Sequence, residues 1–305
     1  MSKVYDLVIL GAGPAGITAS IYAARKKLDL LLISQDIGGQ AAWSADIENY
    51  TGFQFISGPS LVEKFNEHMK AFDIDIKMPE EIRELKKEGD TISLITDRGS
   101  YKTRAAIVAT GKRPKELDLE EEAKFKNKGL TYCATCDGPV FRGKDVAVIG
   151  GGNSALDAAL QLVKFCPRVY IINIADSLAG DSIMIDKLNE SDNVQILNNS
   201  ELKEILGDNF VEEIIVNTEG KERKIRVEGV FVEVGLLPNA DFINIVKKNE
   251  EGEIVVNCNN ETNIEGIFAA GDVTTVAQKQ IIVASGEGAK ASLGAFQYLM
   301  RHNFK

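Results

Sequence analysis

Short apolar runs rich in β-branched residues alternate with helical segments along this chain, and the pattern predicts an α/β fold. Residues 5–10 form one such run, which leads through a glycine-rich turn into a helix that extends to Arg25. Residues 145–149 form a second run, followed by another glycine turn and a helix to about Lys164. Strands that are apolar on both faces are typical of buried parallel sheets.

The two glycine turns are the strongest local motifs. Residues 11–16 read Gly-Ala-Gly-Pro-Ala-Gly, and residues 150–155 read Gly-Gly-Gly-Asn-Ser-Ala. Such a turn lets the backbone approach a pyrophosphate, which then lies at the N-terminus of the following helix. One turn of this kind is a weak indication, but two of them in a strand-to-helix context predict two Rossmann-like nucleotide-binding folds.

The segments after residue 237 indicate how the chain is divided into domains. Pro238 and Asn239 mark a break, after which residues 266–272 again read as a strand, a glycine and an acid. A helix rich in small residues is expected from about 280 to 300, and small residues allow close packing. We therefore interpret the C-terminal part as a return to the first domain. The charged run 115–128 is interpreted as a solvated linker.

Composition narrows the classes of function. The chain has 305 residues, is 44% hydrophobic and carries a net charge of -10, which suits two globular domains and argues against a nucleic-acid binder. No apolar stretch is long enough to span a bilayer, and the N-terminus enters a strand at once, so neither a membrane span nor a signal peptide is expected. Four cysteines, only two of them paired in sequence, fit a reducing compartment, so we expect a cytoplasmic protein.

Cys133 and Cys136 form a Cys-x-x-Cys pair just before the second nucleotide-type strand. One local turn can bring their sulfurs within bonding distance, and one thiol of such a pair usually has a lowered pKa, so the motif predicts a redox-active dithiol. The alternative is half of a zinc site, but zinc needs four ligands. The other candidate ligands are isolated in the sequence, so no metal site is predicted: Cys166, Cys258, His68 and His302.

In order and spacing, these motifs resemble the low-molecular-weight thioredoxin reductase family of flavoproteins, over nearly the whole chain. The resemblance rests on residues 11–16, 38–40, 47–50, 109–111, 133–138, 150–155 and 266–272. It implies FAD in a discontinuous domain formed by 1–114 and 241–305, and an inserted, smaller NAD(P)-type domain at 115–240 that carries the dithiol. It also implies a homodimer and thioredoxin as the disulfide substrate.

The resemblance implies roles for individual residues as well. Cys133 and Cys136 would exchange electrons with the flavin, and Asp137 would act as the general acid, holding a proton near neutral pH. Asp137 can also be a turn-forming Asp-Gly, which is compatible with that role, and the alternative for Asp272 is an ordinary turn aspartate. Lys279 stands where the family usually has arginine. The implied FAD-binding residues are Gly11, Gly13, Pro14, Ala15, Gly16, Gly39, Gln40, Asn49, Thr110, Gly111, Gly271, Asp272, Lys279 and Gln280.

The second unit departs from the family at the positions that select the coenzyme. Members that use NADPH hold its 2′-phosphate with arginines after the next strand, through charge-assisted bonds. Here Ile174 and Ala175 stand in place of the arginine pair and Ala179 in place of a later arginine, while Asp176 would repel a phosphate. NADH is not favoured either, because Asn173 stands where an NAD-binding fold usually places an acid for the ribose.

This loss resembles the ferredoxin-dependent flavin thioredoxin reductases of anaerobes, in which the NADPH site is degenerate. We therefore interpret the chain as a disulfide reductase that receives electrons from reduced ferredoxin, although no motif in the sequence identifies a ferredoxin site. Two alternatives stay open: a thioredoxin reductase that uses NADH or NADPH through an atypical site, and a flavin-bound redox sensor. Trp43 either lines the flavin pocket or fills the core, and Phe304 either covers the flavin or belongs to a frayed terminus.

Overall fold

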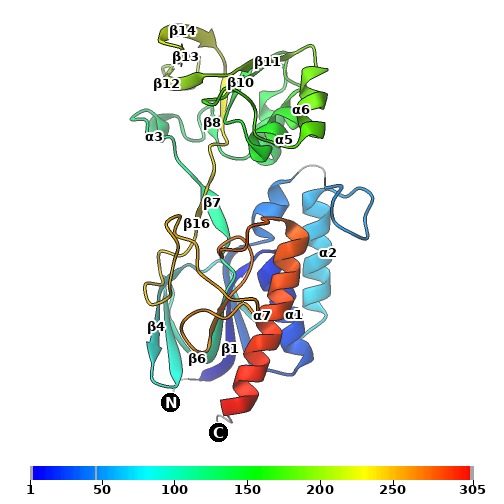
Figure 1. The fold of residues 1–305 in the computed structure, drawn as a ribbon, viewed down its shortest axis with the longest axis vertical. Coiled ribbons are helices and arrows are strands. Elements are labelled where there is room, and N and C mark those ends of the chain that lie inside the picture. Colours follow the sequence, from blue (N-terminus) through cyan, green and yellow to red (C-terminus); the bar gives the residue numbers. More distant parts are fainter. Residues whose placement is uncertain (1–2, 45–46, 303–305) are drawn as a thin grey trace. The chain divides into compact units, whose positions relative to one another are not determined.

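The chain divides into two compact units in the computed structural model, which describes residues 3–44 and 47–302. Unit 1 is formed by Met1–Arg113 together with Leu237–Lys305, and unit 2 by Pro114–Leu236. Each unit has its own sheets and its own hydrophobic clusters. The colours in Figure 1 show that the blue start and the red end of the chain both belong to unit 1.

The two connections between the units pair with each other. β7 (Lys112–Pro114) and β16 (Leu236–Pro238) form a two-stranded sheet. The return to unit 1 was expected at residue 241, whereas it comes at Leu237. The difference arises because Pro238 is the last residue of β16. The chain therefore already belongs to unit 1 before it reaches the break that Pro238 and Asn239 indicate.

Parallel strands form the centre of unit 1. The sheet order is β3-β2-β1-β6-β5-β4, with β17 also paired to β6. β2 and β6 run parallel to β1, β3 runs parallel to β2 and β17 to β6, whereas β4 and β5 are antiparallel additions. The elements are β1 (Val4–Ala12), β2 (Leu30–Ile37), β3 (Asp75–Lys77), β4 (Ile82–Glu88), β5 (Thr91–Thr96), β6 (Ser100–Val108), β17 (Ile267–Ala269), α1 (Pro14–Arg25), α2 (Gly58–Lys70), α7 (Ile281–His302) and the 3-10 turn η1 (Gly39–Trp43).

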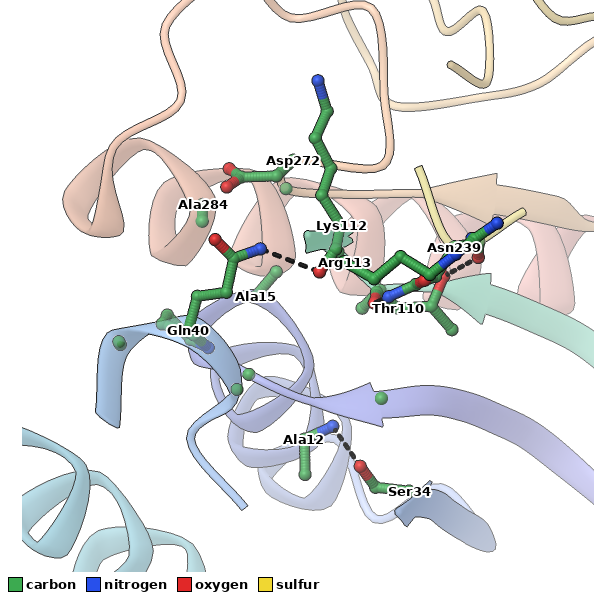
Figure 2. A pocket seen from close by; sticks show the side chains of 18 of the residues that line it. Ala12, Ala15, Ser34, Gln40, Thr110, Lys112, Arg113, Asn239, Asp272 and Ala284 are labelled. Carbon is green, nitrogen blue, oxygen red and sulfur yellow. Dashed lines mark hydrogen bonds between the residues drawn. The ribbon is translucent and has the colours of Figure 1, made fainter. Parts of the chain in front are cut away.

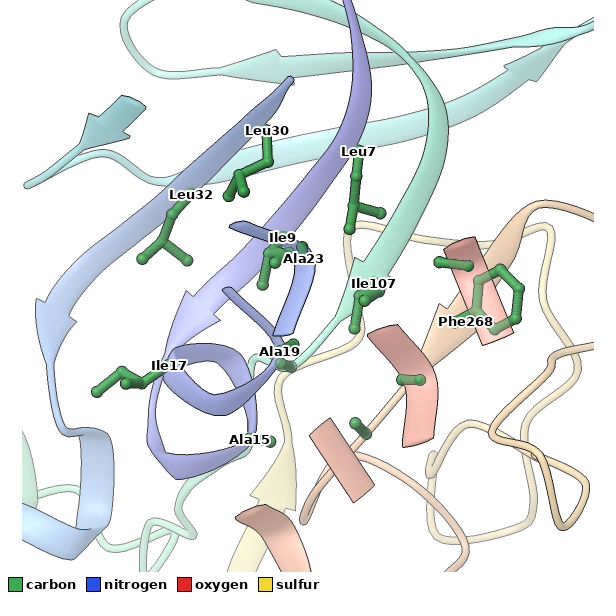
Figure 3. Close-up of a cluster of buried hydrophobic side chains, with 14 of the residues drawn as sticks. Leu7, Ile9, Ala15, Ile17, Ala19, Ala23, Leu30, Leu32, Ile107 and Phe268 are labelled. Atoms are coloured by element: carbon green, nitrogen blue, oxygen red, sulfur yellow. The ribbon is translucent and has the colours of Figure 1, made fainter. Parts of the chain in front are cut away.

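Alternation along β1 explains how the sheet of unit 1 is buried on both faces. Leu7 and Ile9 pack with Ile17 of α1, as Figure 3 shows, while Val8 and Leu10 belong to a cluster on the opposite face. This is the two-residue period of a strand. All four strand side chains are fully buried, and each contributes about 1.5–3 kcal/mol to the free energy of folding. The apolar run of the sequence therefore forms a two-sided core strand.

Helices α1 and α7 lie side by side against one face of this sheet (Figure 1). They touch through their backbones, because a Cβ added to Gly288 would lie only 2.0 Å from the carbonyl oxygen of Ala15. The contact holds the first turn of α1 against the first half of α7. Although α7 has 22 residues, no helix within the described residues is both long and apolar enough to cross a membrane.

Unit 2 contains a five-stranded parallel sheet in the order β11-β10-β9-β15-β8, and a separate antiparallel sheet of β12, β13 and β14. Two hydrophobic clusters cover the two faces of the parallel sheet. The elements are β8 (Leu130–Thr131), β9 (Val146–Ile149), β10 (Val169–Ile172), β11 (Val194–Leu197), β12 (Ser200–Leu206), β13 (Glu213–Thr218), β14 (Lys221–Arg226), β15 (Gly229–Val232), α3 (Glu122–Phe125), α4 (Ala134–Asp137), α5 (Asn153–Leu162), α6 (Ser182–Asn189) and the 3-10 turn η2 (Gly138–Phe141).

The charged run 115–128 is part of unit 2, so its interpretation as a solvated linker was wrong. Phe125 is 1% exposed and belongs to a hydrophobic cluster. Glu122 is also buried, and its carboxylate accepts hydrogen bonds from the Leu117 N–H and the Tyr132 hydroxyl. The many charges of the run hide the apolar position, and the donors that make the burial of Glu122 tolerable are close in sequence, in the run itself and just after it.

The contact of α7 with α1 can be tested with two glycines of the same helix. We expect Gly288→Ala to lower the free energy of unfolding by about 1–3 kcal/mol, because the new methyl group collides with the Ala15 carbonyl. Gly286→Ala is the matched control, since nothing lies within 4 Å of its added Cβ, and it should stabilise the helix by about 0.5–1 kcal/mol. Urea denaturation followed by far-UV circular dichroism measures both. Equal effects of the two substitutions would contradict the backbone contact.

Candidate functional site

A cavity of about 940 Å³ lies next to the residues that follow β1 in unit 1 (Figure 2). In the sheet, β2 is the neighbour of β1 on one side and β6 is its neighbour on the other. Ligands of open α/β sheets bind at such a switch point. Two of the predicted cofactor residues, Gly16 and Asn49, do not line the cavity, but Asn49 donates from Nδ2 to Oε1 of the lining residue Gln280 over 3.0 Å. Trp43 lines the cavity, and Phe304 lies outside the described residues. The predicted cofactor residues in the wall are Gly11, Gly13, Pro14, Ala15, Gly39, Gln40, Thr110, Gly111, Gly271, Asp272, Lys279 and Gln280.

The first glycine turn is shaped by two close backbone approaches. Gly11 has φ +100°, and a Cβ there would lie 2.4 Å from the Ala109 carbonyl oxygen. A Cβ on Gly16 would lie 1.8 Å from the carbonyl oxygen of Gly11. Gly13, the N-cap of α1, faces open space, and no described side chain caps the helix. The first N–H groups of α1 are therefore left for an anionic ligand, and a pyrophosphate fits this arrangement.

Two residues of β2 adjoin this turn and were not among the predicted ones. The Ser34 hydroxyl accepts a hydrogen bond from the Ala12 N–H at 3.0 Å and donates to the Asp36 carbonyl at 2.7 Å. The exposed Asp36 lines the cavity near the end of β2. An acid at this place in the first βαβ unit typically binds a ribose hydroxyl. Its position at the end of the second strand was the signal that would have identified it.

Hydrogen bonds between loops fix the rest of the wall. Gln40 donates from Nε2 to the Lys112 carbonyl over 2.8 Å, which joins the η1 turn to the segment after β6. The Thr110 hydroxyl donates to the Asn239 carbonyl at 2.6 Å, and Nδ2 of Asn239 donates to the Thr110 carbonyl at 3.0 Å. These contacts, labelled in Figure 2, join segments that are far apart in the sequence. They give the cavity a preformed shape.

A buried ion-pair cluster stands at the cavity wall. The Glu253 side chain is 7% exposed, and the Nζ atoms of Lys112 and Lys279 both lie 2.9 Å from its Oε1, while Asn249 donates to Oε2 at 2.9 Å. Burial by itself would raise the pKa of Glu253, but the hydrogen bonds from the two lysines bring it below its ordinary value. Burial raises the pKa of Asp272, and the two lysines oppose that rise. Donors supplied by a ligand would therefore stabilise the Asp272 carboxylate.

The two cysteines of the Cys-x-x-Cys motif form a disulfide in unit 2, with the Cα atoms of Cys133 and Cys136 5.4 Å apart. Cys133 is the N-cap of α4, and its Sγ accepts the N–H of Cys136 over 3.1 Å. Cys136 is exposed. A sulfur that accepts a helix N–H is stabilised as a thiolate once the disulfide opens, which favours Cys133 for that state. In contrast, burial raises the pKa of the free Cys166 thiol to about 11.

Asp137 lies directly beside the disulfide. Its N–H donates to the Cys133 carbonyl at 3.1 Å, and one oxygen of its carboxyl group accepts a hydrogen bond from the Thr131 hydroxyl. Asp137 also lines a second cavity, of about 800 Å³, within unit 2. Val140 and Phe210 belong to the same wall and expose most of their apolar side chains. The carboxyl group is thus held by Thr131 in the residue that follows Cys136, and it belongs to the wall of a cavity with an apolar rim.

At the second glycine turn, the side chain of Asn173 packs directly against Gly151. Asn173 is 4% exposed, and a Cβ added to Gly151 would meet its Oδ1 at 2.3 Å. Nδ2 of Asn173 donates to the carbonyls of Ala175 and Ser177 and to Oδ1 of Asn198, at 3.2, 2.9 and 2.9 Å. The amide is therefore engaged within the protein and packed against the turn.

The following residues, here called the 174–181 segment, fold back onto the same turn. The Ala179 N–H donates to the Gly151 carbonyl at 2.8 Å, and the Asp181 N–H donates to Oδ1 of Asn153 at 2.7 Å. Asn153 is the first residue of α5, so the segment contacts the start of the helix that a coenzyme pyrophosphate would approach. The glycine turn is thus kept and two N–H groups of the segment bond to it and to Asn153, while no described side chain caps the start of α5.

Comparison with known proteins links these two sites to one family. The pyridine nucleotide-disulphide oxidoreductase family matches residues 5–288. The chain is 41% identical over 308 residues to one polypeptide of the alkyl hydroperoxide reductase of Escherichia coli, covering 97% of this chain and 58% of that polypeptide. It is 39% identical over 302 residues to the NADH dehydrogenase of Bacillus subtilis, covering 98% and 59%. The chain thus spans less than two thirds of the length of these relatives.

Solved structures extend the comparison. The thioredoxin reductase of Lactococcus lactis matches with a TM-score of 0.94 at 34% identity, covering 97% of this chain and 99% of that one. A ferredoxin-flavin thioredoxin reductase from Clostridium acetobutylicum matches with a TM-score of 0.55 at 30% identity, covering 99% and 100%. The predicted fold class, two Rossmann-like nucleotide-binding folds, is confirmed by this agreement.

The ion-pair cluster predicts a pH-dependent stability. We expect Glu253→Gln to lower the free energy of unfolding of unit 1 by about 3 kcal/mol at neutral pH, because two lysines lose their carboxylate partner. The pKa of Glu253 is lowered in the folded protein, so its contribution is present above the unfolded pKa of about 4.3 and is lost as the pH falls below it. Urea denaturation at several pH values measures the difference, which should shrink in acid.

The control for this experiment is Glu251→Gln, which changes an exposed neighbour of the same loop. It should leave the free energy of unfolding within about 0.5 kcal/mol of the unsubstituted protein. A loss of similar size for both variants, or a Glu253 effect that does not decline toward acid pH, would contradict the assignment.

Proposed function

The chain belongs to the pyridine nucleotide-disulphide oxidoreductase family, and we propose that it is a flavoprotein that passes electrons from reduced ferredoxin through FAD and the Cys133–Cys136 dithiol to thioredoxin. The likeness to thioredoxin reductases supports the disulfide substrate. The observation that carries the choice of donor lies in unit 2, where Asn173 and the 174–181 segment occupy the surroundings of Gly151.

The cavity of unit 1 supports FAD as the cofactor. The uncapped start of α1 suits its pyrophosphate, Asp36 suits the hydroxyls of the adenosine ribose, and the desolvated Asp272 suits the hydroxyls of the ribityl chain. Bound FAD supplies a carrier that exchanges single electrons with one partner and electron pairs with a disulfide. The protein contributes the binding groups and the charges around them.

The segment after β10 lacks charged groups that a nicotinamide coenzyme would need for tight binding. Residues 173–180 contain neither arginine nor lysine, and Asp176 would repel a 2′-phosphate. Each missing charge-assisted contact costs on the order of 1.5–3 kcal/mol, so the loss of two or three weakens NADPH binding by about 100-fold or more. Asn173 offers no carboxylate to the ribose of NADH, since it is an amide engaged within the protein. An iron–sulfur protein needs no nucleotide pocket, and the likeness to the Clostridium acetobutylicum enzyme supports this donor.

The residues of unit 2 suit the opening of a disulfide. Breaking the Cys133–Cys136 bond takes up two electrons and one proton, and leaves one thiol and one thiolate. The Cys136 N–H stabilises the thiolate on Cys133, and Asp137 supplies the proton to the Cys136 sulfur. The thiolate then attacks the disulfide of thioredoxin, and the resulting mixed disulfide is resolved by the second thiol.

A second candidate is an NADH-dependent enzyme with an atypical coenzyme site. The name of the Bacillus subtilis relative, NADH dehydrogenase, favours it, and so does the intact glycine turn at Gly150 to Gly152. A redox sensor without turnover is a weaker candidate, because Asp137 beside the disulfide serves catalysis and a sensor needs no acid there. The homodimer, the cytoplasmic location and the thioredoxin partner stay predictions.

The donor can be identified by anaerobic stopped flow on the FAD-loaded protein. We expect reduced ferredoxin to bleach the flavin absorbance on the timescale of turnover, while NADPH at the same concentration acts at least about 100-fold more slowly and NADH is also a poor reductant. Dithionite serves as the control, because chemically reduced enzyme should still reduce thioredoxin. Rapid bleaching by NADPH or NADH would reject ferredoxin as the required donor and select the second candidate.

The role of Asp137 can be tested separately. We expect Asp137→Asn to slow reduction of thioredoxin by dithionite-reduced enzyme by roughly 10²–10⁴, the range for a lost general acid. Asn retains the shape of the turn and can still accept the Thr131 hydrogen bond. Cys136→Ser, which removes the disulfide, should abolish turnover while FAD stays bound. If Asp137→Asn lowers the rate of thioredoxin reduction by less than tenfold, Asp137 is not the general acid and only forms the turn.

A further inference from the structure

Two lysines in the wall of the unit 1 cavity share a single carboxylate. The Nζ atoms of Lys112 and Lys279 each lie 2.9 Å from Oε1 of Glu253, whose Oε2 accepts a hydrogen bond from Asn249. The Glu253 side chain is 7% exposed, that of Lys112 12% and that of Lys279 27%. Water screens charges with so little exposure only weakly, so their electric field extends into the cavity.

Hydrogen bonds fix the segments that carry these charges. The Nζ of Lys279 also donates to the Thr274 carbonyl. The Ile254 N–H donates to the Val273 carbonyl at 2.9 Å, which ties the loop of Glu253 to the segment that leads to Lys279. The carboxylate and the ammonium groups are therefore held at defined places in the wall, rather than at the ends of freely moving side chains.

The lysine pair differs from the other cations of the described cavity wall. Arg83 pairs with Glu81 over 2.9 Å, and Arg113 pairs with Asp241 over 2.9 Å, so each arginine has a carboxylate of its own. The two lysines have one carboxylate between them in the ion pairs of the described residues. Their ion-pair cluster therefore carries one positive charge in excess.

Asp272 lies within the field of this cluster. Burial raises the pKa of Asp272, the two lysines oppose that rise, and Glu253 and Glu287 add to it. Glu287 belongs to α7, and its Oε1 lies 3.8 Å from the Nζ of Lys290. Whichever protonation state Asp272 takes, removal of one lysine or of the Glu253 carboxylate changes the sum of charges at this place by one unit, in opposite directions.

The ring system of FAD would lie at the same end of the cavity. With the adenosine ribose at Asp36, the pyrophosphate at the start of α1 and the ribityl chain at Asp272, the isoalloxazine ring comes after the ribityl chain, farthest from β2. Figure 2 shows Gln40, Lys112 and Asp272 on one side of the pocket and Ser34 of β2 on the other. The lysine pair is thus on the side that receives the ring.

Reduction of FAD by two electrons takes up one proton and leaves one negative charge on the flavin. A cation held nearby stabilises that charge and favours the reduced form. We propose that Lys112 and Lys279, held in place by Glu253, set the reduction potential of the bound FAD. Glu253 is a positioning residue, and its own charge offsets one of the two lysines. The inference rests on the FAD binding proposed above.

The test is an anaerobic titration of the FAD-loaded protein with dithionite, in the presence of a reference dye that reports the potential. We expect Lys112→Met to shift the ratio of oxidised to reduced flavin about tenfold toward the oxidised form at a given potential, a decrease of about 30 mV for two electrons. That is the effect of one unit charge about 12 Å away at an effective dielectric constant of about 20. Lys112→Arg keeps the charge and should keep the potential.

Glu253→Gln tests the sign of the effect. The change removes a negative charge and leaves both lysines, so the flavin ratio should shift by a similar factor toward the reduced form. The double variant Lys112→Met/Glu253→Gln restores the sum of charges and should return close to the potential of the unsubstituted protein. A merely structural role would shift the two single variants in the same direction. If Glu253→Gln fails to fold, the comparison of Lys112→Met with Lys112→Arg decides.

Lys247→Met is the control for the loss of a lysine, because Lys247 is exposed and lies outside the cavity wall. It should leave the potential unchanged. Shifts of the same sign in Lys112→Met and Glu253→Gln, or equal potentials in Lys112→Met and Lys112→Arg, would overturn the role of the cluster and leave the proposed function standing. Failure of the unsubstituted protein to bind FAD would instead count against the proposed function.

Discussion

The close approach of backbones around the first glycine turn is the constraint on which unit 1 depends. Gly11 touches the Ala109 carbonyl, Gly16 touches the Gly11 carbonyl, and Gly288 of α7 touches the Ala15 carbonyl. Any side chain at these positions would separate β1, β6, α1 and α7. Because the contacts hold, the start of α1 is presented to the cavity without a capping side chain, and the apolar sheet beneath is sealed on both faces.

Unit 2 uses the same local motif with a different outcome. Gly150 to Gly152 again lead from a buried parallel strand into a helix, but the surroundings of Gly151 are occupied by Asn173 and the 174–181 segment. A glycine turn allows another group to come close to its backbone. The side chains at the end of the next strand, β2 in unit 1 and β10 in unit 2, decide whether that group is a ligand or part of the protein. In unit 1 that strand carries Ser34 and Asp36, which leave the cavity open; in unit 2 it ends in an amide that the protein satisfies itself.

The disulfide site combines groups from one strand and two helices. β8 leads into the Cys-x-x-Cys helix, and α5 supplies Gln161, whose Oε1 accepts the hydroxyl of Thr135 between the two cysteines at 2.8 Å. Asp137 of the Cys-x-x-Cys helix adds a carboxyl group, which accepts the Thr131 hydroxyl. Reduction adds a further negative charge there, so where the protons reside governs how readily the disulfide opens.

The sequence by itself determined the features that depend on near neighbours in the chain. Apolar runs predicted buried strands, glycine spacing predicted both nucleotide-type turns, and the spacing of Cys133 and Cys136 predicted their pairing, because each needs only local geometry. Only the tertiary structure decided where partners come from distant segments. It packed Phe125, from a run that looked solvated, into a hydrophobic cluster with strands of unit 2, and it joined Lys112 and Lys279 through Glu253. A charged side chain is buried or exposed according to the donors that surround it, and those donors are brought together only when the sheets and helices pack.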